Sequence, residues 1–323
     1  MHKRRFLTRR RFLQTLGIGA VSSAALGSYA FAIEPLWRLS VTRYAVTPPG
    51  WTPGLKLKIA LITDLHACNP WMSADRIARI VAQTNALAPD VTLLLGDFSA
   101  GMSSRFVTSY VHASEWAPIL ADLRAPLGRY AVLGNHDWWE DKSAQQRGHG
   151  PTFGQVALEK AGLPVLQNEA IRLEHDGHLF WIAGLGDQIA FLPRPEYGRM
   201  RWQGIDDLPA TLREVTDEAP VILMAHEPDI FPQVRSAKRA VALTVSGHTH
   251  GGQFRVFGYS PVVPSQYGNR YAYGHVVEPR PDGTLAHLIV SGGLGCSIAP
   301  VRFGVPPEIV LVELGAQASA SNQ

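Results

Sequence analysis

The sequence predicts an α/β protein whose sheets are mixed rather than purely parallel, and three observations support this prediction. An apolar, β-branched run of strand length that ends abruptly at a polar residue occurs five times after residue 32. Stretches with helical periodicity separate several of these runs, an alternation that is typical of βαβ units. The end of the chain has strand-like runs without long helices between them. We therefore expect mixed sheets within one domain.

The strand-like runs can be placed in order along the chain. Continuous apolar runs of this kind favour strands that are covered on both faces. The five runs with polar ends are LKIALIT (57–63), DVTLLLG (90–96), YAVLG (130–134), PVILMA (220–225) and VALTVSG (241–247), and the later runs are HVVEPR (275–280), LAHLIVSGG (285–293) and EIVLVEL (308–314).

A helix is predicted over residues 73–87, SADRIARIVAQTNAL. Ser73 is a suitable N-cap, because its hydroxyl can accept a hydrogen bond from the free amides of the first turn. Apolar residues at Ile77, Ile80 and Val81 recur with the helical period. One face of this helix should therefore be buried against a sheet.

The composition is that of a globular protein with one large domain or two small ones. The chain has 323 residues, of which 46% are hydrophobic and 18% are charged. The formal net charge of +3 is misleading, because residues 1–32 hold six Lys or Arg and no acidic residue. The remainder has 24 basic and 27 acidic residues. This mildly acidic body argues against a broad nucleic-acid-binding surface, so no stable nucleic-acid partner is expected.

Residues 1–32 have the layout of a secretory signal, with a basic head, a weakly apolar middle and an Ala-x-Ala site at 30–32. The stretch TRRRFLQ resembles the twin-arginine export signal, with Arg9 and Arg10 as the pair. It predicts the twin-arginine export machinery as a partner and a location in the periplasm or on the outer face of the cytoplasmic membrane. We expect cleavage after Ala32. A retained anchor is the alternative, because the uncharged run 12–33 is long enough to span a bilayer.

After this leader we expect one folded domain over residues 33–315 and a disordered tail over 316–323. The only cysteines are Cys68 and Cys296, so the chain can form neither a disulfide framework nor a four-cysteine zinc site. We expect two unpaired buried thiols, with a single disulfide as the alternative.

Every strong predicted strand ends in side chains that can bind metal ions. In chain order these are Asp64 and His66, then Asp97, then Asn135, His136 and Asp137, then His226, and finally His248 and His250. If the strands are parallel, these side chains meet at one edge, and two residues at i and i+2 of an extended chain point the same way. Carboxylates and imidazoles without thiolates suit Mn, Fe or Zn. So many ligands exceed one coordination sphere and predict two ions.

The ordered motifs DLH, GD, GNHD, MAHEPD and GHTHGG resemble those of the calcineurin-like metallophosphoesterase family. The stretches NEAIRL and GGLGCSIAPVRFGVPPEIVLVEL are similar to its exported or membrane-associated bacterial branch. This resemblance implies an α/β fold, a four-layer α-β-β-α sandwich of two mixed sheets flanked by helices. It also implies hydrolysis of a phosphoester with two divalent metal ions and no organic cofactor.

The resemblance also implies a role for each residue of the motifs. Asp64, His66 and His250 would hold one ion, Asn135, His226 and His248 would hold the other, and Asp97 would bridge them. His136 corresponds to the family's catalytic histidine, with Asp137 beside it to orient or charge it. Trp71, Trp138 and Trp139 follow these motifs, and they should either rim the site or pack as core.

Three functions remain open from the sequence. The first is an exported phosphodiesterase that hydrolyses a phosphodiester or pyrophosphate bond in an envelope lipid, a lipid precursor or a wall polymer. The second is a nuclease or cyclic-nucleotide phosphodiesterase, and the third is a non-catalytic metal-binding envelope protein. The expected partner is thus a phosphoester substrate, free or lipid-linked, together with the membrane surface if the leader is retained.

Overall fold

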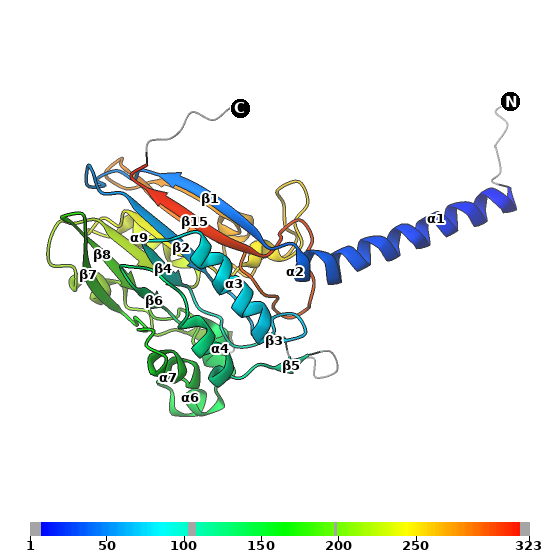
Figure 1. Ribbon diagram of the computed structural model, residues 1–323, viewed down its shortest axis with the longest axis horizontal. Helices are drawn as coiled ribbons and strands as arrows, with labels where there is room; N and C mark the ends of the chain where they lie inside the picture. Colours follow the sequence, from blue (N-terminus) through cyan, green and yellow to red (C-terminus); the bar gives the residue numbers. More distant parts are fainter. Residues whose placement is uncertain (1–7, 103–107, 197–198, 317–323) are drawn as a thin grey trace.

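The computed structural model describes residues 8–102, 108–196 and 199–316. Two β-sheets pack face to face and helices cover their outer faces, as Figure 1 shows. The predicted four-layer sandwich of mixed sheets is confirmed. The predicted disordered tail lies outside the described residues, apart from Ala316.

The first sheet contains three of the five strands that end in predicted ligands. Its order is β1 (Ser40–Val46), β15 (Glu308–Leu314), β2 (Leu57–Ile62), β4 (Val91–Leu94) and β6 (Arg129–Ala131). Strands β2, β4 and β6 are parallel, β15 is antiparallel to β2, and β1 is parallel to β15. The carboxyl ends of β2, β4 and β6 therefore meet at one edge of the sheet.

The second sheet contains the other two strands that end in predicted ligands. Its order is β13 (Gly274–Pro279), β14 (Leu285–Val290), β12 (Leu243–Ser246), β11 (Val221–Met224), β8 (His178–Gly184) and β7 (Glu169–His175). The four central strands are parallel, and the edge strands β13 and β7 are antiparallel to their neighbours. Two small antiparallel pairs stand apart, β9 (Phe191–Glu196) with β10 (Arg199–Gln203) and β3 (Cys68–Asn69) with β5 (Ser109–Tyr110).

Helices pack on both outer faces of the sandwich. On the first sheet lie α3 (Ala74–Ala86), α4 (Ala113–Leu120) and α7 (Phe153–Lys160), and on the second lie α8 (Leu208–Arg213) and α9 (Phe231–Ser236). The short helices α5 (Asn135–Trp139) and α6 (Lys142–Arg147) follow β6, and single turns form η2 (Pro228–Ile230), η3 (His250–Gly252) and η4 (Gly268–Tyr271). Ser73 caps α3 as predicted, since its hydroxyl accepts from the Arg76 amide.

The central core lies between the sheets. Ile59 and Leu61 of β2 face Ile222 and Met224 of β11, and Val310 of β15 joins the same apolar cluster. Both sheets are therefore covered on two faces, which accounts for the continuous apolar runs in the sequence. Their rigid packing fixes the strand ends on which the predicted ligands sit.

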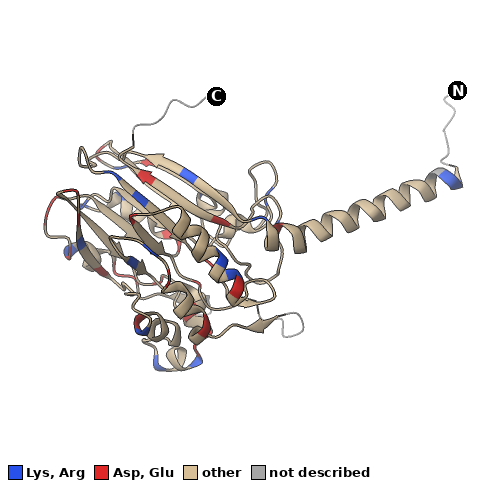
Figure 2. Cartoon of the chain, in the orientation of Figure 1, with Lys and Arg blue, Asp and Glu red and all other residues tan. Residues whose placement is uncertain are grey.

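The N-terminal segment is helical and projects from the body, as Figure 1 shows. It comprises α1 (Arg9–Ser28), the π-helical turn η1 (Tyr29–Ile33) and α2 (Glu34–Trp37). Within it, Phe12–Trp37 is long and apolar enough to cross a membrane. Figure 2 marks Lys or Arg residues at the free end of α1 and no charged residue along the rest of its length.

Strand register places the start of β1 at the same edge as the end of β2. Ser40, the first residue of β1, lies opposite Glu308 of β15, and Leu61 near the end of β2 lies opposite Val310. The N-terminal helix thus leaves the body on the side where the ligand-bearing strands end.

Candidate dinuclear metal centre

The structure brings together all seven residues that the sequence predicts as metal ligands. They follow β2, β4 and β6 in the first sheet and β11 and β12 in the second, and they form two groups of side chains at the shared edge. In each group the atoms able to bind a metal lie within 4.8 Å of one another.

The first group contains Asp64, His66 and His250. Nε2 of His66 lies 3.0 Å from Nε2 of His250, and His250 Nε2 lies 3.5 Å from Asp64 Oδ1. All three side chains are buried. On its far side the His66 ring is fixed, because its Nδ1 lies 3.2 Å from the carbonyl oxygen of Ser99.

The second group contains Asp97, His226 and His248, with Asn135 beside them. His226 Nε2 lies 3.3 Å from Asp97 Oδ2, and His248 Nδ1 lies 2.9 Å from Asn135 Oδ1. The Nδ1 atom of His226 is 2.6 Å from the Leu95 carbonyl oxygen, so Nδ1 carries a proton that it donates there, and Nε2 faces the group.

Asp97 lies between the two groups. Its Oδ2 atom is 3.5 Å from His66 Nε2 and 3.3 Å from His226 Nε2, while Oδ1 accepts a hydrogen bond from the His136 amide at 2.8 Å. One carboxylate oxygen therefore faces both groups. The neighbouring glycine permits this approach, because a Cβ on Gly134 would lie 2.4 Å from Asp97 Oδ1.

Five of the ligand residues have left-handed backbone conformations, which are uncommon for residues with a Cβ atom. They are Asp64, His66, Asp97, His248 and His250, with φ between 46° and 68°. Each such residue costs about 1–3 kcal/mol and persists only where its surroundings enforce it. Here the amides of Asp64 and His66 donate to the carbonyls of Gly96 and Asp97. Strain concentrated on the ligands is typical of a functional site.

Burial determines the protonation of most of the ligand histidines. It lowers the pKa of His66 and of His248 to about 3 and holds the pKa of His250 well below its usual range. These three rings are neutral at neutral pH, the form that binds metal ions. His226 differs: burial opposes its charge, but the Asp97 carboxylate outweighs burial and raises the pKa of His226 well above its usual value.

The donor set fits two metal ions. The Nε2 atoms of His66 and His250 face each other, and His226 Nε2 is buried without a hydrogen-bond partner among the described residues. Neutral imidazoles that converge in this way repel one another unless a cation or a proton lies between them. Imidazole and carboxylate ligands without a thiolate suit Mn, Fe or Zn.

His136 lies next to both groups, and one of its ring nitrogens lies within 4.8 Å of ligand atoms of His66 and Asp97. Its ring packs edge-on against His66, with centroids 5.0 Å apart, and against Trp139, with centroids 5.1 Å apart. Its Nδ1 atom is 3.9 Å from Glu140 Oε1, an ion contact too long for a hydrogen bond. Burial opposes the charged ring, but Asp97 and Glu140 outweigh it and raise the pKa of His136 above its usual value.

The Asp137 carboxylate binds backbone amides. It accepts from Asp97, Phe98, Ser99 and Gly134 at 2.9–3.0 Å. It thereby ties the loop after β4 to the loop after β6. The carboxylate that lies against the His136 ring belongs to Glu140, which sequence reasoning missed although the i, i+4 spacing from His136 was a usable signal.

Of the three tryptophans, only Trp139 lies directly against the His136 ring. Trp138 is fully buried and packs on Phe191, so it belongs to the core. Trp139 stacks on Trp202 of β10 at 5.1 Å, which extends an aromatic surface outward from His136. The strand that carries Trp202 was not predicted.

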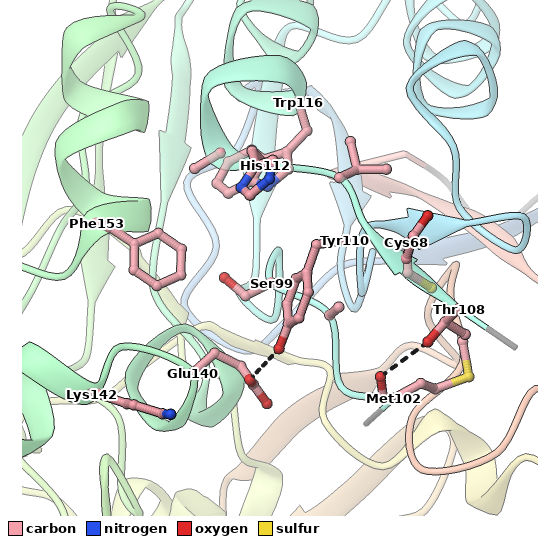
Figure 3. Close-up of a pocket in the computed structure, with 14 residues that line it drawn as sticks. Cys68, Ser99, Met102, Thr108, Tyr110, His112, Trp116, Glu140, Lys142 and Phe153 are labelled. Atoms are coloured by element: carbon pink, nitrogen blue, oxygen red, sulfur yellow. Dashed lines mark hydrogen bonds between the residues drawn. The ribbon is translucent and has the colours of Figure 1, made fainter. Parts of the chain in front are cut away.

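A cavity of about 550 Å³ lies beside Glu140. Figure 3 shows Trp116, Phe153 and Cys68 in its walls and Tyr110 projecting into it. The Tyr110 hydroxyl donates to Glu140 Oε2 at 2.6 Å. The cavity is mostly apolar, and Glu140 connects it to His136.

The two cysteines are free and buried, as predicted. They lie in one small apolar cluster with Ala100 and Met102. Burial raises the pKa of the Cys68 thiol to about 11 and also raises that of Cys296.

Comparisons with known proteins identify similar sequences and structures. The profile of the calcineurin-like phosphoesterase family matches residues 57–252. The metallophosphoesterase YkuE of Bacillus subtilis is 28% identical over 315 residues, which cover 95% of this chain and 98% of YkuE. The phosphodiesterase YaeI of Escherichia coli is 28% identical over 315 residues, 95% of this chain and 99% of YaeI. The NAD nucleotidase NadN of Haemophilus influenzae superposes with a TM-score of 0.48 and 15% identity, over 78% of this chain and 50% of NadN.

A sandwich whose strand ends present two histidine-rich groups with a shared carboxylate defines a metal-dependent phosphoester hydrolase. The chain belongs to the calcineurin-like phosphoesterase family, whose profile spans more than half of its residues. The non-catalytic alternative is thereby removed.

Proposed function

We propose that the protein is a phosphodiesterase that acts on an envelope component, namely a lipid, a lipid precursor or a wall polymer. The observation that carries the proposal is the position of Asp97 Oδ2, 3.5 Å from His66 Nε2 and 3.3 Å from His226 Nε2. A carboxylate oxygen between two groups of ligands is what a two-metal site for in-line displacement at phosphorus requires.

In this proposal each group holds one divalent ion, and Asp97 contributes to both. Asp64, His66 and His250 form one set, and Asn135, His226 and His248 form the other. Ions bound there supply Lewis acidity, which offsets the charge of the phosphoryl oxygens and makes water a nucleophile at neutral pH.

His136 acts as the general acid. Its raised pKa favours the protonated ring, the form that can donate a proton to the leaving alkoxide. Glu140 supports this charge from one side and Asp97 from the other. Asp137 acts indirectly, because it fixes the backbone from which Asp97 and His136 project.

The cavity beside Glu140 supports a diester rather than a monoester substrate. A diester carries a second organic group, and a largely apolar cavity of about 550 Å³ beside Glu140, the partner of the general acid, can hold one. Trp139 and Trp202 offer a further flat surface for an apolar substituent. YaeI, similar over almost its whole length, is named as a phosphodiesterase.

The N-terminal segment supports an envelope location. Arg9 and Arg10 begin an apolar helix, the order found in export signals, and we propose transport by the twin-arginine route. The folded domain over residues 33–315 would then lie outside the cytoplasm.

Hydrolysis of bis-p-nitrophenyl phosphate and p-nitrophenyl phosphate, with Mn²⁺, Fe²⁺ or Zn²⁺ added singly to metal-free protein, tests the proposal. We expect faster hydrolysis of the diester, and no hydrolysis by the Asp97→Ala variant. The matched control is Asp176→Asn, which changes an exposed carboxylate on the β7–β8 turn. Hydrolysis of the monoester alone contradicts the proposal. Faster turnover of a cyclic nucleotide or of single-stranded DNA than of a glycerophosphodiester favours the nuclease alternative.

A further inference from the structure

The base of the N-terminal helix is built into the folded body. The carbonyl oxygen of Ala30 accepts a hydrogen bond from the Arg302 amide at 2.9 Å. Glu34 is buried, and its carboxylate accepts from the Val305 amide at 2.8 Å. Tyr29 packs edge-on against Phe303, with ring centroids 5.9 Å apart. Cleavage after Ala32 would remove two of these three contacts.

Beyond its base the described part of the helix is largely exposed. Apolar side chains such as Leu16, Ile18 and Val21 are 60–72% exposed. The span Phe12–Trp37 has 26 residues. The 17 residues Phe12–Ser28 lie beyond the base, and at about 1.5 Å per residue they measure roughly 26 Å, close to the roughly 30 Å hydrocarbon core of a bilayer. An apolar helix of this length without a protein partner has the dimensions of a membrane span.

Exposed apolar side chains surround the base of this helix. They are Trp37 from α2, Phe254, Phe257, Tyr259 and Val262 from the loop after η3, and Ile298 from the loop before β15, and we call them the apolar collar. Figure 1 shows these two loops, coloured gold and orange-red, beside the helix base. The most exposed members are Phe257 at 104% and Ile298 at 84%.

Contacts hold the collar against the helix. Phe254 stacks on Phe303 at 5.2 Å, and Phe303 is the residue against which Tyr29 packs. Val256 and Tyr259 exchange backbone hydrogen bonds, so Phe257 stands at the tip of a tight turn. The exposed side chains are therefore presented by an ordered loop that is joined to the helix base.

The metal centre lies on the same side of the molecule as the collar. The ligands follow the carboxyl ends of their strands, and the register of β1 and β2 against β15 places the helix base at that edge. Arg302 connects the helix base directly to the metal centre. Its amide donates to the carbonyl of Ala30, and its side chain contacts the candidate ligand His250.

We propose that α1 is retained as a membrane anchor and that the apolar collar rests in the bilayer interface, with the metal centre opening toward the membrane surface. The occupant of this surface is a lipid bilayer, because the collar is continuous with a helix of membrane length. Trp37 and Tyr259 suit the headgroup level, where aromatic residues with a polar atom concentrate. The arginines at the free end of α1 place that end on the cytoplasmic side and the body outside. The arrangement does not depend on which phosphoester is hydrolysed.

Fluorescence quenching in proteoliposomes tests this arrangement. The full chain, with Phe257→Cys or Ile298→Cys labelled by a thiol-reactive fluorophore, is reconstituted in phosphatidylethanolamine and phosphatidylglycerol vesicles that contain nitroxide lipids. The control is Asp176→Cys on the β7–β8 turn, because β8 runs toward the metal centre and so begins at the opposite end of the body. We expect loss of fluorescence at both collar positions and unchanged fluorescence at the control. Unquenched collar labels, or equal quenching at all three positions, overturn the proposal.

The mass of the wild-type protein purified from membranes provides a second test. We expect a chain that still contains residues 12–32, and a chain that begins at Ile33 overturns the retained anchor. Hydrolysis of bis-p-nitrophenyl phosphate by the same preparations reports separately on the catalytic proposal. Active protein with unquenched collar labels refutes the docking surface alone, and inactive protein with quenched labels refutes the proposed function alone.

Discussion

Nη2 of Arg302 lies 3.2 Å from Nδ1 of His250, on the side of the imidazole that faces away from Asp64 and His66. Arg302 is fully buried, and its guanidinium donates to the carbonyl oxygens of Gly292, Gly295 and Val305. Its charge contributes, after burial and His66, to holding the pKa of His250 well below the usual value. A buried guanidinium thus lies against the ring nitrogen of His250 that points away from the first group of side chains.

Replacing this arginine should destabilise the fold. The Arg302→Met variant leaves several buried carbonyl groups without donors, and we expect it to lose at least about 2 kcal/mol of unfolding free energy. Urea denaturation of metal-free and metal-loaded protein measures the loss. The control is Arg43→Met, whose ion pair with Glu313 at 4.0 Å is exposed and should contribute little. Equal stability of the two variants would show that the buried contacts of Arg302 are unimportant.

Asp97→Ala should abolish the binding of two metal ions, because its carboxylate faces both groups of ligands. Elemental analysis of the variant should fall from about two ions per chain to one or none. The exposed control Asp176→Asn should retain the wild-type content. Two ions retained in Asp97→Ala contradict the shared-carboxylate assignment.

His136→Ala should keep the metal content and lower turnover by about 10²- to 10⁴-fold, the usual contribution of a positioned acid.

Glu140→Gln should lower turnover less than His136→Ala does, and it should change the pH dependence of turnover. Removing the negative charge beside His136 lowers the pKa of the ring, so activity should begin to fall at a lower pH than in the wild type. Measuring kcat against pH for the two variants checks both expectations. An unshifted profile in Glu140→Gln rules out a positioning role.

Replacing Arg9 and Arg10 together by lysine should keep the protein inside the cell, because the charge survives but the paired guanidinium groups do not. Fractionation of cells and immunodetection measure the distribution. Export at the wild-type level would falsify the twin-arginine route. A variant with lysine at Arg38, just after α2, serves as the control and should be exported normally.

Both thiols should react slowly with iodoacetamide in the folded protein at pH 8. The pKa of Cys68 is raised to about 11 by burial, so little reactive thiolate exists at that pH, and the pKa of Cys296 is also raised. Reactivity should increase as the pH approaches 11, or when the protein is unfolded in urea. Mass spectrometry after timed alkylation measures it, and rapid alkylation of folded protein at pH 8 contradicts the buried cluster.

The clustering of the candidate metal ligands could be predicted from the sequence because each follows an apolar strand, and strand direction then determines where the side chains meet. Arg302 could not be predicted in the same way. Its partners are backbone carbonyls of Gly292, Gly295 and Val305, and a carbonyl leaves no trace in residue type. The chemistry of a buried network is visible in the sequence only where side chains contact side chains.

Other features were hidden by local sequence effects. The hairpin β9–β10 was not predicted, because FLPRPE contains two prolines, which normally argue against a strand. Without that hairpin the stacking of Trp139 on Trp202 could not be inferred. Asp137 is adjacent to His136 in the sequence, but the turn at the start of α5 directs its carboxylate to the amides of Asp97, Phe98 and Ser99. Adjacency in sequence therefore did not indicate adjacency of side chains.

The position of β15 determines when the sheet can be completed during synthesis. Among the described strands β1 pairs only with β15, and β15 is the last of these strands along the chain. The partners Ser40 and Glu308 are joined by nearly the whole intervening chain, so this pairing is a long-range contact that forms slowly. The N-terminal helix can therefore be fastened to its body only after residues 302–305 and β15 have been synthesised, because Ala30 and Glu34 bind the amides of Arg302 and Val305. Until then a nascent chain carries an apolar helix without the segments that hold its base.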